Sequence, residues 1–283
     1  MYNYYQGRER AEHSFYTDLA CERRRADTDT EGVEYKKSPA SVGIWESVKI
    51  TSEEGEREIL RPMGRYDTLL TKRLDLMDED ALYDAREELA RRLCEIFDEN
   101  DIFPARILVI GLGNQRLTPD SVGPKSATRV KPTLHISELE PEIFDKLECS
   151  EIAVFCPSVS AISGMESAAL ARSVCEQLLP DAVIAIDSIM TRSKERLGTT
   201  FQLSNTGLFP GGVGNLATPI TRATMGAPVI SIGVPTVMDC RYIHDGFDEG
   251  ENFFISPREI DEITDNAAFV IGGAINQAFG LEM

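Results

Sequence analysis

Four short, continuous apolar runs constrain the fold of this chain more than any other feature. The runs cover residues 105–114, 151–157, 182–189 and 228–235. Apolar runs of this length without alternating polar positions are typical of strands buried on both faces. Segments with helical spacing lie between and after them. Strands that alternate with helices form parallel pairs through crossover connections, so the order predicts an α/β fold with a mostly parallel central sheet and helices on both faces.

The chain ahead of these runs is less regular. Residues 77–100 carry apolar side chains at helical spacing behind an acidic first turn, which predicts a helix. Apolar and polar residues alternate over 41–53, which predicts a half-buried strand. Residues 61–70 predict a turn and a second extended segment. Residues 1 to about 40 are polar and charged, which is typical of a solvated arm.

Composition excludes several classes of function. The chain has 283 residues, 29 Lys and Arg against 47 Asp and Glu, and a net charge of −18, which argues against direct nucleic-acid binding through a cationic face. It has no apolar stretch near the ~20 residues of a membrane span and no secretory signal, so we expect no membrane partner and a cytoplasmic location. The six cysteines show no CxxC pairing, which predicts reduced thiols. The three histidines are scattered and have no ligand spacing, so we expect no metal and no cofactor.

The first candidate for chemistry is the loop after the strand at 105–114. Gly111 and Gly113 suit a tight turn, but Arg116 stands where a dinucleotide-binding motif has its third glycine. The loop displays three polar side chains, Asn114, Thr118 and Asp120. Asp120 is either a catalytic carboxylate or the cap of the next helix, and the pattern leaves both open.

The second candidate is Asp187, at the end of the apolar strand 182–189. There it either faces the active edge of the sheet, where burial could raise its pKa, or it caps a loop or pairs with nearby Arg192. Asp120 and Asp187 both follow strands of one predicted sheet, so they can face one cleft. Two carboxyls with separated pKa values can supply the acid and the base of peptide hydrolysis. We expect four further residues to line that cleft: Asn114, Thr118, Ser188 and Thr236.

Six segments in a consistent order resemble the germination protease family of spore-forming bacteria. They are residues 64–69, 109–125, 163–167, 181–196, 204–215 and 226–239. The resemblance implies an atypical aspartic endopeptidase whose catalytic residues match Asp120 and Asp187 here. It implies small acid-soluble spore proteins as substrates during germination, a location in the forespore and spore core, and a homotetramer. The family fold is similar to that of the hydrogenase-maturation endopeptidases, whose equivalent acidic residues bind nickel.

The resemblance also implies a zymogen that removes its own N-terminal segment. Residues 16–22 resemble the family's self-cleavage sequence, which would place cleavage between Asp18 and Leu19. We therefore expect a flexible arm over 1–18 and a single α/β protease domain over 19–283, with 19–100 as a candidate peripheral lobe. The alternative for the arm is a disordered tail with an accidental match.

Two other classes of function remain open at this stage, a metal-assisted maturation-type peptidase and a non-catalytic protein that binds spore peptides. The sequence departs from the family in its connection to the last helix, and Cys21 and Cys156 do not match a residue expected of the family. Residues 240–255 form a short connection where family members often carry a long insertion, which puts the full substrate-recognition surface in doubt.

Overall fold

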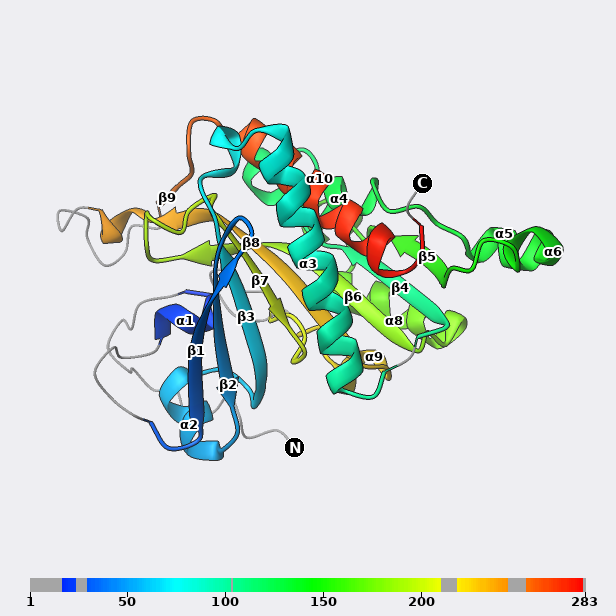
Figure 1. Ribbon diagram of the computed structural model, residues 1–283, viewed down its shortest axis with the longest axis horizontal. Coiled ribbons are helices and arrows are strands. Elements are labelled where there is room, and N and C mark those ends of the chain that lie inside the picture. The colour runs from blue at the N-terminus through cyan, green and yellow to red at the C-terminus, as the bar shows by residue number, and fades with distance from the viewer. Residues whose placement is uncertain (1–16, 24–29, 103, 210–217, 244–252, 282–283) are drawn as a thin grey trace.

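One mixed sheet runs through the protein, seen in a computed structural model that describes residues 17–23, 30–102, 104–209, 218–243 and 253–281 (Figure 1). Nine strands lie within these residues, in the order β1-β2-β3-β7-β8-β6-β4-β5 with β9 beside β8. The strands are β1 (Val33–Ala40), β2 (Gly43–Ile50), β3 (Gly64–Leu70), β4 (Arg106–Gly111), β5 (Glu151–Phe155), β6 (Ala182–Thr191), β7 (Thr200–Ser204), β8 (Val229–Asp239) and β9 (Phe254–Ile255).

The four apolar runs became the four parallel strands, β4, β5, β6 and β8. The expectation of a mostly parallel sheet was wrong, because β1, β2, β3, β7 and β9 all pair in antiparallel fashion. Strands β1 and β2 form a hairpin, which needs no crossover helix. Strand β1 also lies inside the stretch predicted to be a solvated arm.

Helices cover both faces of the parallel half, as predicted. On one face, α3 (Glu79–Glu99), α4 (Val122–Ala127) and α10 (Ile260–Ala278) pack against Ile107 and Val109 of β4 (Figure 1). On the other face, α8 (Ser167–Leu178) and α9 (Arg222–Met225) pack against Leu108 and Ile110 of the same strand. Successive side chains of a strand point to opposite faces, so a continuous apolar run serves both cores. The helix predicted at 77–100 is confirmed as α3.

Strands β1–β3 extend the same sheet, because β3 pairs with β7. Their far face carries a small core of its own, in which Val48, Ile50 and Tyr66 pack with Ala20 of α1 (Ala20–Arg23) and Ile59 of α2 (Glu53–Ile59). The segment just after residue 16 is therefore packed onto the sheet.

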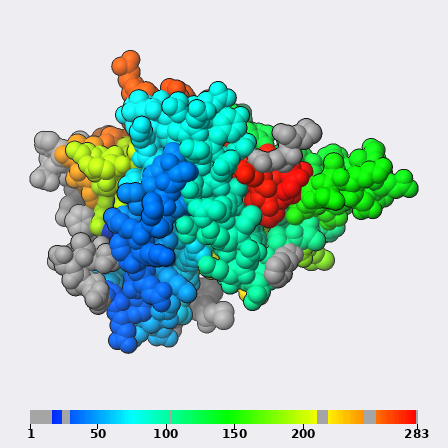
Figure 2. All heavy atoms as spheres, in the orientation of Figure 1, coloured from blue at the N-terminus to red at the C-terminus, as the bar shows by residue number. Residues whose placement is uncertain are grey.

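The remaining elements are short. They are α5 (Leu134–Leu139), α6 (Pro141–Phe144), α7 (Ser160–Ser163) and the 3-10 turns η1 (Leu74–Leu76), η2 (Thr118–Asp120) and η3 (Cys240–Tyr242). Helices α5 and α6 project from the body of the protein (Figure 2). Within the described residues, no helix combines the length and the apolar character that crossing a membrane requires.

Candidate active site

Strands β4 and β6 lie side by side in the parallel part of the sheet, and the chain leaves them towards opposite edges of the sheet. From β4 the chain adds β5 on one side, and from β6 it adds β8 on the other. The carboxyl ends of two such strands leave a crevice, the usual ligand site of open α/β sheets. Asp120 follows β4 and Asp187 lies towards the end of β6, and both line a cavity of about 670 Å³. This volume is in the range of small-molecule and peptide pockets.

Hydrogen bonds within the loop between β4 and α4 hold the carboxylate of Asp120 in place. The backbone N–H of Asn114 donates to Oδ2 of Asp120 at 2.9 Å, and Thr236 Oγ1 donates to the carbonyl of Pro119 at 2.6 Å. Gly113 has φ of +111°, and a Cβ there would lie 2.2 Å from the backbone oxygen of Asp120. Only glycine fits this turn. The carboxylate thus accepts a bond from its own loop, and Ser121 takes the N-cap position of α4.

Asp187 lies at the edge of the same cavity, where Ser188 N donates to its Oδ1 at 2.8 Å. Burial, and then the negative charge of Asp120, raise the pKa of Asp187 well above its usual range, with a smaller contribution from Asp18. Burial also raises the pKa of Asp120, against the opposing bond from Asn114 N. The pair therefore retains a proton at a pH where two exposed aspartates would both be ionised.

The four predicted cleft residues separate into two groups. Ser188 and Thr236 line the cavity. Asn114 and Thr118 belong to the loop beside it and are outside the lining, although Asn114 supplies the N–H that holds Asp120. Arg192, the alternative partner of Asp187, offers its backbone N–H to Glu22 at 3.0 Å.

Residues 17–23 pack beside the cleft, and Asp18 is the one residue of this segment that lines it. The Asp18 carboxylate accepts from Arg61 at 2.9 Å and from Met190 N at 2.8 Å, and Asp18 N donates to Met190 O at 2.9 Å. The two following residues, Leu19 and Ala20, are fully buried. Asp18 and Asp187 line the same cavity. Residues 1–16 of the predicted arm lie outside the described residues.

A single side chain spans the peptide bond between Asp18 and Leu19. Gln202 of β7 donates from Nε2 to the carbonyl oxygen of Asp18 at 3.2 Å, and its Oε1 accepts from Ala20 N at 2.9 Å. This amide fixes the backbone on both sides of the bond that the sequence resemblance marks for cleavage.

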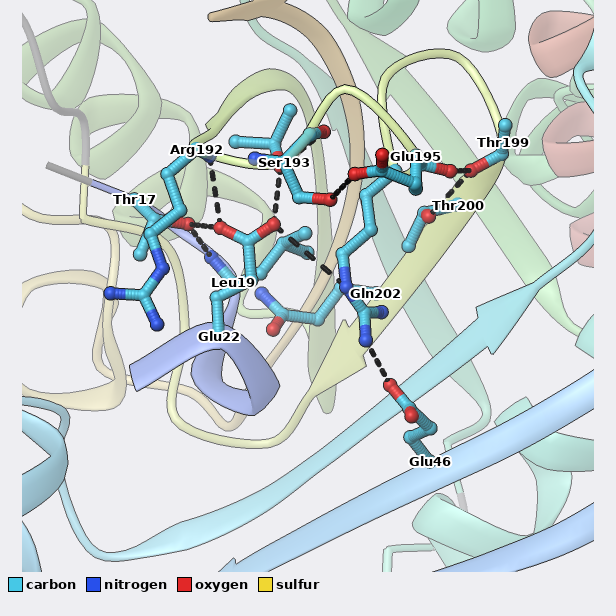
Figure 3. Close-up of polar contacts among 12 residues, drawn as sticks. Thr17, Leu19, Glu22, Glu46, Arg192, Ser193, Glu195, Thr199, Thr200 and Gln202 are labelled. Atoms are coloured by element: carbon cyan, nitrogen blue, oxygen red, sulfur yellow. Dashed lines mark hydrogen bonds and ion pairs between the residues drawn. The ribbon is translucent and has the colours of Figure 1, made fainter. Parts of the chain in front are cut away.

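Glu22 enters a second, buried site beyond the cavity. Its carboxylate accepts from the hydroxyls of Thr17 and Thr191 and from Arg192 N, and the Arg196 guanidinium lies 3.8 Å away (Figure 3). Arg196 also pairs with Glu46 of β2, so the site joins the end of β6 to the antiparallel part of the sheet.

Sequence reasoning missed the residues that hold this segment. Gln202 left only a weak signal, because β7 reads Thr-Phe-Gln-Leu-Ser and the threonine and serine beside it are polar as well. Arg61 and Arg196 left none, because they come from a turn and a loop and meet the segment only in three dimensions. Metal binding was an open alternative, and among the described residues no group of three or more His, Cys, Asp and Glu side chains is arranged to hold an ion.

Comparison with known proteins gives a consistent result. Residues 11–248 match the family model described as germination protease. The chain is 34% identical to a germination protease of Caldanaerobacter subterraneus subsp. tengcongensis over 93% of each chain, and 30% identical to one of Clostridium perfringens strain 13 over 93% of this chain and 94% of that one. A Bacillus subtilis germination protease is 34% identical over 79% of this chain and 63% of its own.

Among solved structures, the protein has a limited likeness to the [NiFe] hydrogenase maturation protease HycI of Thermococcus kodakarensis. The TM-score is 0.38 at 16% identity, over 65% of this chain and 99% of that one. A TM-score this low gives the likeness no weight for function.

Proposed function

The chain belongs to the germination protease family of endopeptidases, and we propose that it first cleaves itself between Asp18 and Leu19 through acid–base catalysis by Asp120 and Asp187. The observation that best supports this proposal is the common cavity, which Asp18, Asp120 and Asp187 all line. The amide of Gln202 across the Asp18–Leu19 bond is a second support, because it holds that bond in a defined orientation.

The roles of the two aspartates follow from their surroundings. Asp187 is the more strongly perturbed, so we assign it the shared proton and Asp120 the ionised form. The Asp120 carboxylate takes a proton from water as the water oxygen attacks the carbonyl carbon of Asp18. Asp187 gives its proton to the developing oxyanion, towards which Gln202 Nε2 is already directed. Asp120 then passes the proton it took from water to the leaving nitrogen, and Asp187 takes back a hydroxyl proton of the tetrahedral intermediate. The C–N bond breaks, which leaves an acid at Asp18 and an amine at Leu19 and restores both aspartates.

We extend the proposal to the family's substrates. The protein would then cut small acid-soluble spore proteins in the cytoplasm of the germinating spore, and would assemble as a homotetramer. The acidic chain, with a net charge of −18, suits binding to protein rather than to the DNA that those substrates cover.

The test is incubation of the purified full chain at mildly acid pH, followed by N-terminal sequencing. The proposal predicts a new terminus at Leu19, and no such product from Asp120→Asn or Asp187→Asn. A chain that stays intact, or a variant that still yields Leu19 at the wild-type rate, would overturn it. Loss of activity on chelation would favour the metal-assisted alternative. A spore protein that is bound but uncut would favour the binding class.

A further inference from the structure

Thr236 stands at an irregularity in β8, the strand beside β6. Residues 183–189 of β6 pair one to one with residues 229–235 of β8. The next pair is Met190 with Val237, so Thr236 is an extra residue without a partner in β6. Such a bulge redirects a side chain. Thr236 and Val237 accordingly both line the cavity, whereas successive side chains of a regular strand point to opposite faces.

The hydroxyl of Thr236 reaches the loop that carries Asp120. Thr236 Oγ1 donates to the carbonyl of Pro119 at 2.6 Å, and Thr236 has no exposed surface. Asp120 follows β4, whereas Asp187 lies in β6 and Thr236 in β8. Since β6 is the strand between β4 and β8, this bond ties the loop after β4 across the strand that carries Asp187.

We propose that Thr236 is a positioning residue, which holds Asp120 near Asp187 through the carbonyl of Pro119. The role rests on the proposed catalysis by the two aspartates. Ser188 of β6 adds a longer bond to the same segment, in which its Oγ accepts from Val122 N at 3.4 Å. The bond from Thr236 is much the shorter, so we expect it to set the place of the loop.

The distance between the two carboxyls decides how strongly the charge of one opposes ionisation of the other. After burial, the charge of Asp120 is the largest cause of the raised pKa of Asp187, ahead of that of Asp18. A loop that is released from β8 can move away from Asp187, since like charges repel. Loss of the Thr236 hydroxyl should therefore lower the pKa of Asp187.

The other charged groups around the pair have contacts that do not involve Thr236. The titratable or charged residues that line the cavity are Asp18, Arg61, Tyr66, Asp120, Glu166 and Asp187. The charged residues that α4, β4 and β8 add outside it are paired, Lys125 with Asp265, Arg106 with Glu151 and Asp239 with Arg241. A change at Thr236 should therefore act on the two aspartates alone.

The competing explanation is that Thr236 only stabilises the loop. The pKa of Asp187 distinguishes the explanations, because it is read from the carbon chemical shift of the carboxyl in the labelled full chain and needs no cleavage. The signal is identified by its absence from Asp187→Asn. Thr236→Val removes the hydroxyl at nearly constant volume, and Thr236→Ala repeats the test if valine prevents folding. Thr236→Ser keeps the hydroxyl.

We expect Thr236→Val to lower the pKa of Asp187 and to slow self-processing by about 10- to 100-fold, because a general base has been displaced. Thr236→Ser should restore the pKa and bring the rate to within about threefold of wild type. The matched control is Thr133→Val. Thr133 is also buried, its hydroxyl donates to Ser150 O at 2.7 Å, and it lies outside the cavity lining, so both readouts should stay as in wild type.

An unchanged pKa of Asp187 in Thr236→Val would overturn the positioning role, whatever the rate. A serine variant that behaves like the valine variant would do the same, and so would a lowered pKa that Thr133→Val reproduces, since general loosening would then explain it. A pKa lowered by Thr236→Val alone, in a chain that never cleaves itself, would support the role and refute the proposed protease activity.

Discussion

Gln202 gives the sharpest test of the proposed chemistry. Replacing it with methionine keeps the length of the side chain and removes both contacts to the segment, the bond to the Asp18 carbonyl and the bond from Ala20 N. An ordinary hydrogen bond contributes about 1 kcal/mol net, so two lost bonds weaken docking by about 2 kcal/mol, or about 30-fold. Loss of an oxyanion donor costs about 10²–10³-fold in rate. We therefore expect Gln202→Met to slow self-processing by at least about 100-fold.

The assay is the rate at which the fragment beginning at Leu19 appears, followed by intact mass spectrometry. Hydrogen exchange over residues 17–23 measures docking separately, with the Asp18 amide as reporter because its bond to Met190 O does not involve Gln202. Gln177→Met is the control, since Gln177 is exposed on α8. A rate loss below about 30-fold, matched by faster exchange at Asp18, would show that Gln202 only docks the segment. A rate within threefold of wild type would refute any role.

The remaining predictions concern the aspartates and their loop. Asp120→Asn and Asp187→Asn should each slow self-processing by about 10²–10⁴-fold with an unchanged circular dichroism spectrum, because each removes one proton-transfer group. The pH–rate profile should fall as pH rises through the raised pKa of Asp187, since the general acid loses its proton there. For stability, a folded-state pKa above the unfolded value gives a contribution that is full below the unfolded pKa and lost as pH rises through the folded pKa. Asp187→Asn should therefore raise the thermal midpoint more at about pH 8 than at about pH 4. Gly113→Ala should cost roughly 3 kcal/mol or more in urea unfolding, because its Cβ would meet the Asp120 oxygen at 2.2 Å, whereas Gly164→Ala, at φ +72° with open space, should cost only roughly 1 kcal/mol.

The parallel half of the sheet was predictable because strands buried on both faces need no polar positions. Helix α3 was predictable because its apolar side chains recur at helical spacing over 21 residues. Both patterns are local, and both aspartates were found because Asp187 interrupts one apolar run and Asp120 lies in the loop after another. Strand β6 continues past Asp187 to Thr191, so this residue does not end the strand as predicted. The pattern could not decide between catalysis and capping, since the direction of a carboxylate depends on contacts such as Asn114 N to Asp120.

Some features escaped prediction because their local signal is weak, and others because they depend on contacts between distant parts of the chain. Strand β1 is polar and only partly buried, so its pairing with β2 has little apolar signal. Ser163 and Glu166 predict a capping box for the following helix, yet α8 begins at Ser167 and Glu166 accepts from Thr218 N. The pairing of β3 with β7, the contacts of Arg61 and the buried site around Glu22 all join distant parts of the chain.

The burial of Leu19 gives the cleavage step a direction. Hydrolysis would replace a neutral amide with an ammonium group on a residue that has no exposed surface. It would also create a new carboxylate on Asp18, in a cavity that the ionised Asp120 and the side-chain carboxylate of Asp18 already line. A buried ammonium and a third negative charge both favour departure of the severed ends. The proposed reaction would thus remove the contacts that allow it, so each molecule would pass this point once and would then have a cleft free for its next encounter.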